Sequence, residues 1–399
     1  MISVTEATRI IASHALDFGT EQIHLDHCSG KILRESIFAD ADMPPFDRVA
    51  MDGIAICYKT FEEGARIFPI VSMAAAGSPQ QQLIAITACI EIMTGAILPV
   101  GADAIIPYEW ITIENGNAIV NKENVLKGQN IHRRGTDKKK GDMLIQQGKL
   151  ISSSEAGILA SVGKITVTVS IQPKVLIVST GDELIAINKQ PLPHQLRMSN
   201  VFQLQHALRE LKINADHIHL HDDFKLISES LQREFSHYQM IIISGGMSAG
   251  KFDHIPAVLD SLHVEKHFYK VRQKTGKPFF FGTHENGCVI FGVPGNPVSA
   301  FLCYIRFIKP FTELCIQKTN RKQVIAKLAE DIVIKNELTN FIPVRMDQND
   351  NAEVIAIPVK GHGSGDFSIL TDADAFIELP AGREIYQKGE TYTVYSFRA

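Results

Sequence analysis

Residues 175–178 read VLIV and lead directly into the polar turn STGDE at residues 179–183. A short apolar run that ends in a turn is typical of a strand buried on both faces of a sheet. Further elements alternate after it: we expect helices at 201–212 (capped by Ser199 or Asn200), 223–235 and 298–314, and strands at 217–220, 240–243, 279–282 and 289–291. This alternation predicts helices on both faces of a mostly parallel sheet, as in doubly wound α/β domains.

Three of the predicted strands end in loops rich in glycine and small polar residues. These loops are STGDE at 179–183, SGGMSAG at 244–250 and GVPGNP at 292–297. Ligands of parallel α/β sheets bind beyond the carboxyl ends of the strands, and free N–H groups near helix starts hold anions. Each loop alone could be only a tight turn. Three at equivalent strand ends favour a site for a phosphate or another oxoanion.

Charged residues near these loops suit an anion and its counter-ion. Five carboxylates that could help to bind Mg²⁺ are Asp182, Glu183, Asp222, Asp223 and Asp253. Helix capping explains Asp223 and Asp253 equally well, since Asp is a favoured N-cap residue. Three lysines precede the strand at 279–282, namely Lys270, Lys274 and Lys277. Lysines bind phosphates as point charges, so this cluster is compatible with anion binding.

Three other patterns are less convincing as sites. Residues 245–251 have the spacing of a P-loop, but Phe252 stands where Ser or Thr would hold Mg²⁺. The basic run at 132–140 fits a solvated linker better than an anion site. His217, His219 and His221 share one face of a predicted strand. A transition-metal site there would need further ligands at motif spacing.

The flanking regions are rich in short β segments. We expect a helix at 4–16 and then β-rich runs between 43 and 120, with Asn115-Gly116 as the turn of a hairpin. Ser152 and Glu155 fit a capping box for a helix that Gly163 ends. Strands return after residue 317, which predicts a small closing β-barrel or sandwich.

Composition narrows the class of protein. The 399 residues are 45% hydrophobic and carry a formal net charge of −4, so the chain can bury several cores and is not disordered. This charge argues against a dedicated nucleic-acid binder. The first residues lack the features of a signal peptide, no segment is long and apolar enough for a membrane, and the six cysteines form no CxxC pair. We therefore expect a cytoplasmic protein.

Six segments in order along the chain resemble the molybdopterin molybdenumtransferases, the family of bacterial MoeA and the gephyrin E domain. The segments are PPFD and AMDG (44–47, 50–53), MTGA and LPVGAD (93–96, 98–103), RRG, Asp137 and GD (133–142), STGDEL (179–184), SGGMS (244–248) and PGNPVS (294–299). Each motif is weak alone, but six in this order are specific and span nearly the whole chain. The chain departs from the family pattern at Arg48, Met198 and Lys251.

The resemblance implies a multidomain architecture and an activity. The expected domains are an N-terminal dimerisation domain (1–42 plus 138–170), an inserted β-rich domain (43–137), an α/β molybdopterin-binding domain (171–317) and a C-terminal β-barrel domain (318–399). The implied enzyme is a homodimeric transferase that inserts molybdate into adenylylated molybdopterin and releases AMP, with Mg²⁺ present and an adenylylating partner protein. The alternative is a non-catalytic molybdopterin carrier or scaffold with the same fold.

Matching positions carry the family's functional residues onto this chain. The resemblance implies catalytic roles for Asp52, Thr94, Asp137, Glu183 and Asp253, and Mg²⁺ ligation by Glu183, Asp222 and Asp253. The implied substrate-binding residues are Ser179, Thr180, Gly181, Asp222, Ser244, Gly245, Gly246, Ser248, Lys270, Lys274, Lys277, Pro294, Gly295, Asn296, Pro297, Arg345 and Ser364.

Overall fold

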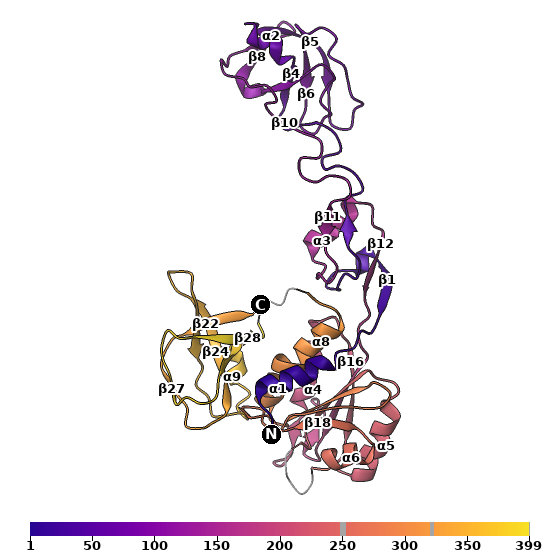
Figure 1. Cartoon of the computed structure of the whole chain (residues 1–399), viewed down its shortest axis with the longest axis vertical. Helices are drawn as coiled ribbons and strands as arrows, with labels where there is room; N and C mark the ends of the chain where they lie inside the picture. Colours follow the sequence, from indigo (N-terminus) through magenta and orange to yellow (C-terminus); the bar gives the residue numbers. More distant parts are fainter. Residues whose placement is uncertain (248–252, 320–322, 399) are drawn as a thin grey trace. The chain divides into compact units, whose positions relative to one another are not determined.

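The computed structural model describes residues 1–247, 253–319 and 323–398. The chain divides into two compact units (Figure 1). Unit 1 comprises Met1–Glu35, Gly148–Ser153 and Thr166–Ala399, and unit 2 comprises Ser36–Gln147 and Ser154–Ile165. None of the helices in the described ranges has the length and apolar character needed to cross a bilayer.

A six-stranded sheet forms the centre of unit 1, in the order β16-β13-β17-β21-β20-β18. The strands are β13 (Val175–Thr180), β16 (Ala215–Leu220), β17 (Met240–Ser244), β18 (Glu265–Tyr269), β20 (Phe280–Thr283) and β21 (Val289–Val293). The first four in spatial order are parallel, and β20 and β18 join them in antiparallel fashion. The predicted mostly parallel sheet is confirmed.

Helices cover both faces of this sheet (Figure 1). On one face lie α1 (Val4–Ser13), α4 (Ser199–Arg209), α7 (Pro297–Cys303) and α8 (Lys309–Cys315), and on the other α5 (Phe224–Glu234) and α6 (Ile255–Ser261). Successive side chains of β13 point to opposite faces of the sheet. Ile177 packs in the core beneath α1, α4, α7 and α8, and Leu176 and Val178 pack in the core beneath α5 and α6.

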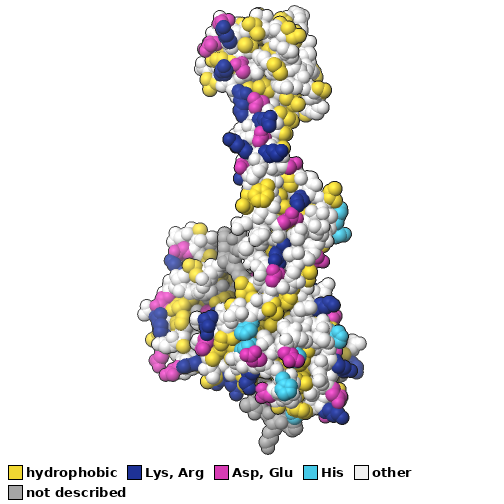
Figure 2. Space-filling model, turned by 45° about the vertical axis from the view of Figure 1, so that its right-hand side comes forward, with side chains coloured by type: hydrophobic (Ala, Val, Ile, Leu, Met, Phe, Trp, Pro, Cys, Tyr) yellow, Lys and Arg dark blue, Asp and Glu magenta, His cyan; other side chains and the backbone are white. Residues whose placement is uncertain are grey.

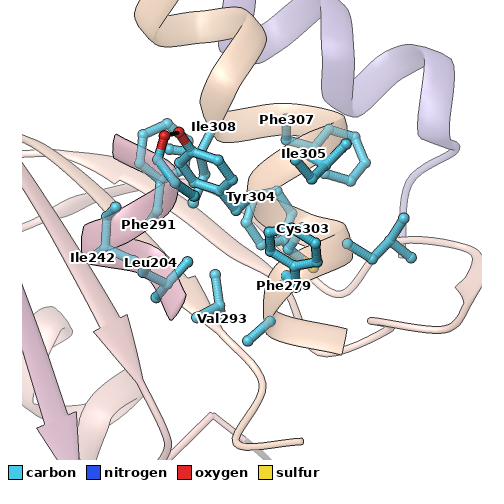
Figure 3. Packing of buried hydrophobic residues seen from close by; sticks show 14 of the residues in the cluster. Leu204, Ile242, Phe279, Phe291, Val293, Cys303, Tyr304, Ile305, Phe307 and Ile308 are labelled. Atoms are coloured by element: carbon cyan, nitrogen blue, oxygen red, sulfur yellow. Dashed lines mark hydrogen bonds between the residues drawn. The ribbon is translucent and has the colours of Figure 1, made fainter. Parts of the chain in front are cut away.

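The apolar helix expected at 298–314 is interrupted. A π-helical turn at Tyr304–Ile308 separates α7 from α8. Pro310 has no N–H to donate to the preceding turn, which accounts for the change of helical pitch just before it. Tyr304 is fully buried in this core beside Phe279 and Phe291 (Figure 3), and its hydroxyl donates to the carbonyl of Ala207 across 2.8 Å.

A closed five-stranded barrel ends the chain, also within unit 1. Its strands follow the order β24-β25-β22-β28-β26 and return to β24. They are β22 (Val324–Leu328), β24 (Thr339–Gln348), β25 (Val354–Pro358), β26 (Ala375–Leu379) and β28 (Thr391–Ser396). The predicted barrel is therefore confirmed. The short strand β19 (Gln273–Lys274) pairs with β24 and so joins the α/β region to the barrel.

Unit 2 contains a second six-stranded sheet, in the order β7-β4-β6-β5-β9-β8. Its strands are β4 (Gly53–Ile56), β5 (Ile67–Ala74), β6 (Cys89–Ile92), β7 (Ala104–Pro107), β8 (Ile111–Glu114) and β9 (Asn117–Val120). The Asn115-Gly116 hairpin is confirmed, since both residues have positive φ (49° and 77°), as a type I′ turn requires.

Shorter elements complete the two units. They are β1 (Thr20–His24), β2 (Ile37–Phe38), β3 (Arg48–Val49), α2 (Tyr58–Glu62), β10 (Ile131–His132), β11 (Met143–Ile145), α3 (Ser153–Ser161), β12 (Thr166–Ser170), β14 (Leu184–Ile185), β15 (Leu196–Arg197), β23 (Ile332–Val333), α9 (Ile369–Asp372) and β27 (Ile385–Tyr386), with 3₁₀ turns at Leu25–His27 and Tyr108–Trp110. Gly163 ends α3 with φ of 71°, as expected for a C-terminal cap.

Candidate active site

A cavity of about 560 Å³ opens at the carboxyl ends of β13, β17 and β21. Its lining includes the strand-end residues Ser179, Thr180, Ser244, Gly245, Gly295, Asn296 and Pro297, the first turn of α4, and Glu183, Met198 and Phe367. All of these residues belong to unit 1. The cavity therefore lies where the three predicted ligand loops meet, as expected for a parallel α/β sheet.

Asn200 braces two of the three strand ends. Its side-chain amide donates to the Ser244 hydroxyl (3.0 Å) and to the carbonyl of Gly295 (2.8 Å). The prediction that Ser199 or Asn200 caps α4 is wrong, because α4 begins at Ser199 and the N-cap position is Met198. The Asn200 amide is used across the cavity instead. Its two partners lie 44 and 95 positions away along the chain, so local sequence carries no signal for this role.

Two glycines allow the turn after β17 to pass close to β13. Gly245 and Gly246 both have positive φ (100° and 62°). A Cβ at Gly245 would lie 2.5 Å from the carbonyl oxygen of Thr180, so no other residue fits there without movement. Gly181 also has positive φ and lets the chain turn beneath the Glu183 carboxylate.

The Thr180 hydroxyl is a candidate ligand contact. Its Oγ1 atom is buried and has no hydrogen-bond partner among the described residues. A buried hydroxyl without a partner is costly, because it has lost its hydrogen bonds to water. Thr180 also lines the cavity, so an acceptor bound there would satisfy this group.

Two histidines of β16 lie against the Ser179 hydroxyl. The Oγ atom of Ser179 lies 3.0 Å from Nε2 of His217 and 3.1 Å from Nδ1 of His219. Burial and the neighbouring His219 lower the pKa of His217. The third histidine of the series, His221, instead pairs with Asp182 across 2.8 Å.

Acidic side chains lie close together beyond the ends of β13 and β16, and their pKa values are shifted in opposite directions. The hydrogen bond from His221 lowers the pKa of Asp182. Burial, followed by the charges of Asp182 and Glu183, raises the pKa of Asp222. Asp223 instead caps α5 by accepting from the N–H of Leu226 (2.7 Å), so the capping interpretation holds for Asp223. For α6, the N-cap position is His254, not Asp253.

These carboxylates suit a cation that takes some of its ligands from the protein and the others from a substrate. In the part of the chain that the structure describes, no three His, Cys, Asp or Glu side chains form a metal site by themselves. Mg²⁺ rarely needs such a site, because it keeps waters and binds substrate phosphates. Burial is the main cause of the raised pKa of Asp222, and repulsion from Asp182 and Glu183 adds to it. A cation bound there would relieve the part that is due to repulsion.

A second hollow of about 320 Å³ lies between the barrel region and the part of the α/β region formed by Lys274, Thr275 and the start of α7. Lys274, Thr275, Asn340 and Ser364 contribute to its lining. Asn296 belongs to the first cavity and donates its amide to the Ser364 hydroxyl across 2.9 Å. This hydrogen bond links a residue of the first lining to a residue of the second. Lys274 and Ser364 line the same hollow.

Other predicted substrate residues occupy different positions in unit 1. Pro294 follows β21, and Pro297 is the first residue of α7, where its missing N–H is not needed. The Lys270 ammonium lies 4.9 Å from the centre of the Tyr269 ring. Lys270, Lys277 and Arg345 do not line either hollow. Arg345 is exposed on β24, and Ser248 lies outside the described residues.

The predicted catalytic residues of unit 2 form two polar pairs. Both the N–H and the hydroxyl of Thr94 donate to Oδ1 of Asp52, at 2.5 and 2.7 Å. These bonds lower the pKa of Asp52, so it is a carboxylate at neutral pH. Asp137 pairs with Nε2 of His132 across 2.9 Å. The sequence placed Asp52 and Thr94 in separate motifs, and the fold of unit 2 joins them.

Two arginines of the basic run form ion pairs within unit 2. Arg133 pairs with Asp47 (2.5 Å), and Arg134 pairs with Asp42 (2.6 Å). Figure 2 shows Lys and Arg side chains interleaved with Asp and Glu next to the six-stranded module of this unit. The pairing agrees with the linker interpretation, because these two guanidinium groups already have anionic partners.

Comparison with known proteins matches all three regions of the chain. Residues 2–163 match the MoeA N-terminal region (domain I and II), residues 176–313 a probable molybdopterin binding domain, and residues 326–397 the MoeA C-terminal region (domain IV). The residues that line the first cavity fall within the match to the molybdopterin binding domain, except for Gly365 and Phe367.

Full-length relatives agree with these matches. The molybdopterin molybdenumtransferase of Synechocystis sp. is 38% identical over 100% of both chains. That of Haemophilus influenzae is 31% identical over 95% of this chain and 94% of its own. The crystal structure of the molybdopterin biosynthesis MoeA protein from Pyrococcus horikoshii OT3 superposes with a TM-score of 0.84, at 27% identity and with full coverage of both chains. The chain belongs to the molybdopterin molybdenumtransferase family.

Proposed function

We propose that this protein is a transferase of molybdenum cofactor biosynthesis that inserts molybdate into adenylylated molybdopterin and releases AMP. The observation that carries the proposal is the cavity of about 560 Å³ at the ends of β13, β17 and β21, in the region that matches a molybdopterin-binding domain. The relatives named molybdopterin molybdenumtransferase support the same activity.

The cavity offers neutral donors for anionic substrates. Ser179, Thr180 and Gly245 line it, and Gly245 begins the turn that Gly246 continues. Backbone N–H groups in such turns and hydroxyl groups bind phosphate oxygens without a full charge. Lys274, beside the second hollow, adds a positive charge for molybdate or phosphate. We propose that Lys270, Lys277 and Arg345 serve the same anions through their flexible side chains.

We propose that Glu183, Asp222 and Asp253 hold Mg²⁺ together with the substrate's phosphates. Glu183 lines the cavity, and its charge contributes to the raised pKa of Asp222. When bound there, the metal would act as a Lewis acid on the phosphoanhydride and stabilise the charge of departing AMP. The chain's own part is to orient the anhydride through the Ser179, Thr180 and Asn296 side chains.

The family match supports a role in the reaction for three residues of unit 2. Asp52, Thr94 and Asp137 are proposed catalytic residues, and Asp52 is held ionised by Thr94. We also propose that the protein is a cytoplasmic homodimer with the four domains expected above, and that a separate protein supplies the adenylylated substrate. Helix α1, from the first of these domains, packs on the α/β sheet.

Molybdate-dependent AMP release tests the proposal directly. Purified protein is mixed with adenylylated molybdopterin, Mg²⁺ and molybdate, and AMP is quantified for wild type, Asp253→Ala and Lys274→Ala. We expect release by the wild type that needs molybdate and that both variants lose. Tight pterin binding without release would instead support the non-catalytic carrier or scaffold.

A further inference from the structure

The Ser179 hydroxyl sits between two imidazoles at the wall of the cavity. Ser179 is 2% exposed. The parallel register of β13 and β16 places His219 directly beside Ser179 and His217 beside Ile177. Both ring nitrogens lie within hydrogen-bond distance of the one hydroxyl oxygen. The proposed reaction assigns no role to either histidine.

Burial fixes the proton on His219. The Nε2 atom of His219 is buried without a hydrogen-bond partner among the described residues. A buried N–H without a partner is rarer than a buried acceptor without one. In a singly protonated His219 ring, the proton therefore belongs on Nδ1, which faces Ser179. In this tautomer His219 donates to the Ser179 oxygen.

Of the two histidines, His217 is the one that can change the nitrogen that carries its proton. Its lowered pKa keeps it neutral near pH 7. A hydroxyl has one proton and two acceptor sites, so two arrangements are possible. Either Ser179 donates to a bare Nε2 of His217, or His217 donates through Nε2–H and the hydroxyl proton turns into the cavity. Only the second arrangement offers Ser179 as a donor to a ligand.

We propose that His217 and His219 are positioning residues that turn the Ser179 hydroxyl into a donor for a bound oxoanion, and that His217 carries its proton on Nε2 when the anion is present. An oxoanion only accepts hydrogen bonds, so it selects this arrangement. The inference rests on the proposed function, which brings phosphate and molybdate oxygens to this cavity. Met198 Sδ, 3.5 Å from the Ser179 oxygen, is only a weak competing acceptor.

Among the titratable groups near Ser179, His217 is the one whose protonation we expect to change when an anion binds. Ser179 of β13 lies within hydrogen-bond distance of it, and His219 of β16 influences it electrostatically. Beyond the strand ends, Asp182 is paired with His221, and Asp222 is influenced by Asp182, Glu183 and His254. A change on His217 can occur by moving its proton between ring nitrogens or by taking up a second proton, and both put a proton on Nε2.

Histidine ¹⁵N NMR of the full chain tests the tautomers. Spectra are recorded without ligand, with AMP and with molybdate, added separately so that a phosphate and a metal oxoanion can be distinguished. We expect His219 to be protonated at Nδ1 throughout, and His217 to gain a proton at Nε2 with at least one of the anions. A bare Nδ1 on His219, or a bare Nε2 on His217 in the anion-bound protein, would overturn the proposal.

Affinity measurements with matched variants separate positioning from structural support. His217→Gln and His219→Asn can present an amide N–H near the same nitrogen positions, whereas His217→Leu and His219→Leu cannot. We expect each Leu variant to bind the anion about tenfold more weakly, the scale of one hydrogen bond to a charged group, and the amide variants to recover most of this loss. The surface variant His237→Gln, on a side chain that is 69% exposed, should bind like wild type.

A double-mutant cycle with Ser179→Ala provides the decisive comparison. If the histidines act through Ser179, their Leu substitutions cause no further loss once the hydroxyl is absent. Equal losses in both backgrounds would mean structural support only and would overturn the proposal. Wild-type protein that binds anions, with Leu variants that bind equally well, refutes the histidine role alone. Wild-type protein that binds neither anion would refute the proposed function, and the histidine role with it.

Discussion

The amide of Asn200 donates to the hydroxyl of Ser244 across 3.0 Å and so ties the first turn of α4 to the end of β17. The second hydrogen of the same amide reaches the carbonyl of Gly295 beyond β21. One side chain thus fixes the spacing of two ligand loops, which could otherwise shift independently.

Replacing Asn200 should weaken ligand binding more than it weakens the fold. Asn200→Ala removes both bonds, and we expect a loss of about 1–3 kcal/mol in AMP affinity, typical of unpaired polar groups at a site. Calorimetric titration with AMP measures it, alongside thermal unfolding. The matched control is Gln205→Ala, which removes a 2.8 Å bond from α4 to Ala215 outside the cavity. It should lower stability and leave affinity unchanged. Equal affinity losses in both variants would refute the bracing role.

A methyl group at Gly245 should destabilise the fold, whereas one at Gly295 should not. Gly245 has φ of 100° and its Cβ would meet the Thr180 carbonyl at 2.5 Å, whereas the nearest atom to a Cβ at Gly295 is 3.9 Å away. We expect Gly245→Ala to cost roughly 1–3 kcal/mol of unfolding free energy and to reduce AMP release. Gly295→Ala, at a cavity position where a Cβ has room, should unfold like the wild type. Denaturant unfolding and the AMP assay check both. A tolerated Gly245→Ala would mean that the close approach of the β17 turn to β13 does not constrain this position.

The Thr94 hydroxyl should help to keep Asp52 ionised. The Thr94 N–H, followed by its hydroxyl, lowers the pKa of Asp52. Thr94→Val keeps the N–H and removes the hydroxyl, so the pKa of Asp52 should rise partway towards its ordinary value of about 3.9. Thr94→Ser should leave it low. Carboxyl NMR titration reads this directly, and an unchanged pKa in Thr94→Val would show that the N–H alone is responsible.

The sign of this effect also fixes its pH dependence. Because the folded-state pKa of Asp52 lies below its unfolded value, the interaction stabilises the fold above the unfolded pKa. The stabilisation is lost as the pH falls through the lowered value. Any difference in stability between wild type and Thr94→Val should therefore be present at neutral pH and disappear in acid.

Local patterns predicted the elements that are strongly apolar or that have sharp turn signals. The buried strand β13 and the Asn115-Gly116 hairpin are examples. The same patterns missed β18 (Glu265–Tyr269), an edge strand whose sequence EKHFY mixes charged and apolar residues. They also missed the π-helical turn before Pro310, because periodicity alone does not show how the hydrogen-bond ladder adjusts around a proline.

The candidate site divides in the same way. The three glycine-rich loops could be located because each follows a buried strand, and the fold brings them to one cavity. The bond between Asn296 and Ser364 joins residues 68 positions apart, and local sequence carries no signal for such a contact. His217 and His219 were recognised as sharing a strand face, but their common partner Ser179 follows only from the register of β13 and β16.

A buried ion pair connects the helices of the α/β region to the barrel. Arg306 pairs with Glu378 across 3.1 Å, and their side chains are only 10% and 19% exposed. Arg306 also donates to the Thr8 hydroxyl, and Tyr395 donates to Glu378. Removing one charge from such a pair leaves the other buried without compensation, so Glu378→Gln should cost about 3–5 kcal/mol of unfolding free energy.

Two comparisons make this value interpretable. Glu229→Gln breaks the exposed pair between Lys225 and Glu229 (84% and 62% exposed) and should cost no more than about 0.5 kcal/mol. The double variant Arg306→Met/Glu378→Leu removes both buried charges and should recover much of the loss, because the net worth of a buried pair is small. Denaturant unfolding at constant pH measures all three. If Glu378→Gln cost as little as Glu229→Gln, water must reach the Arg306 guanidinium, and this contact would not hold the barrel in place.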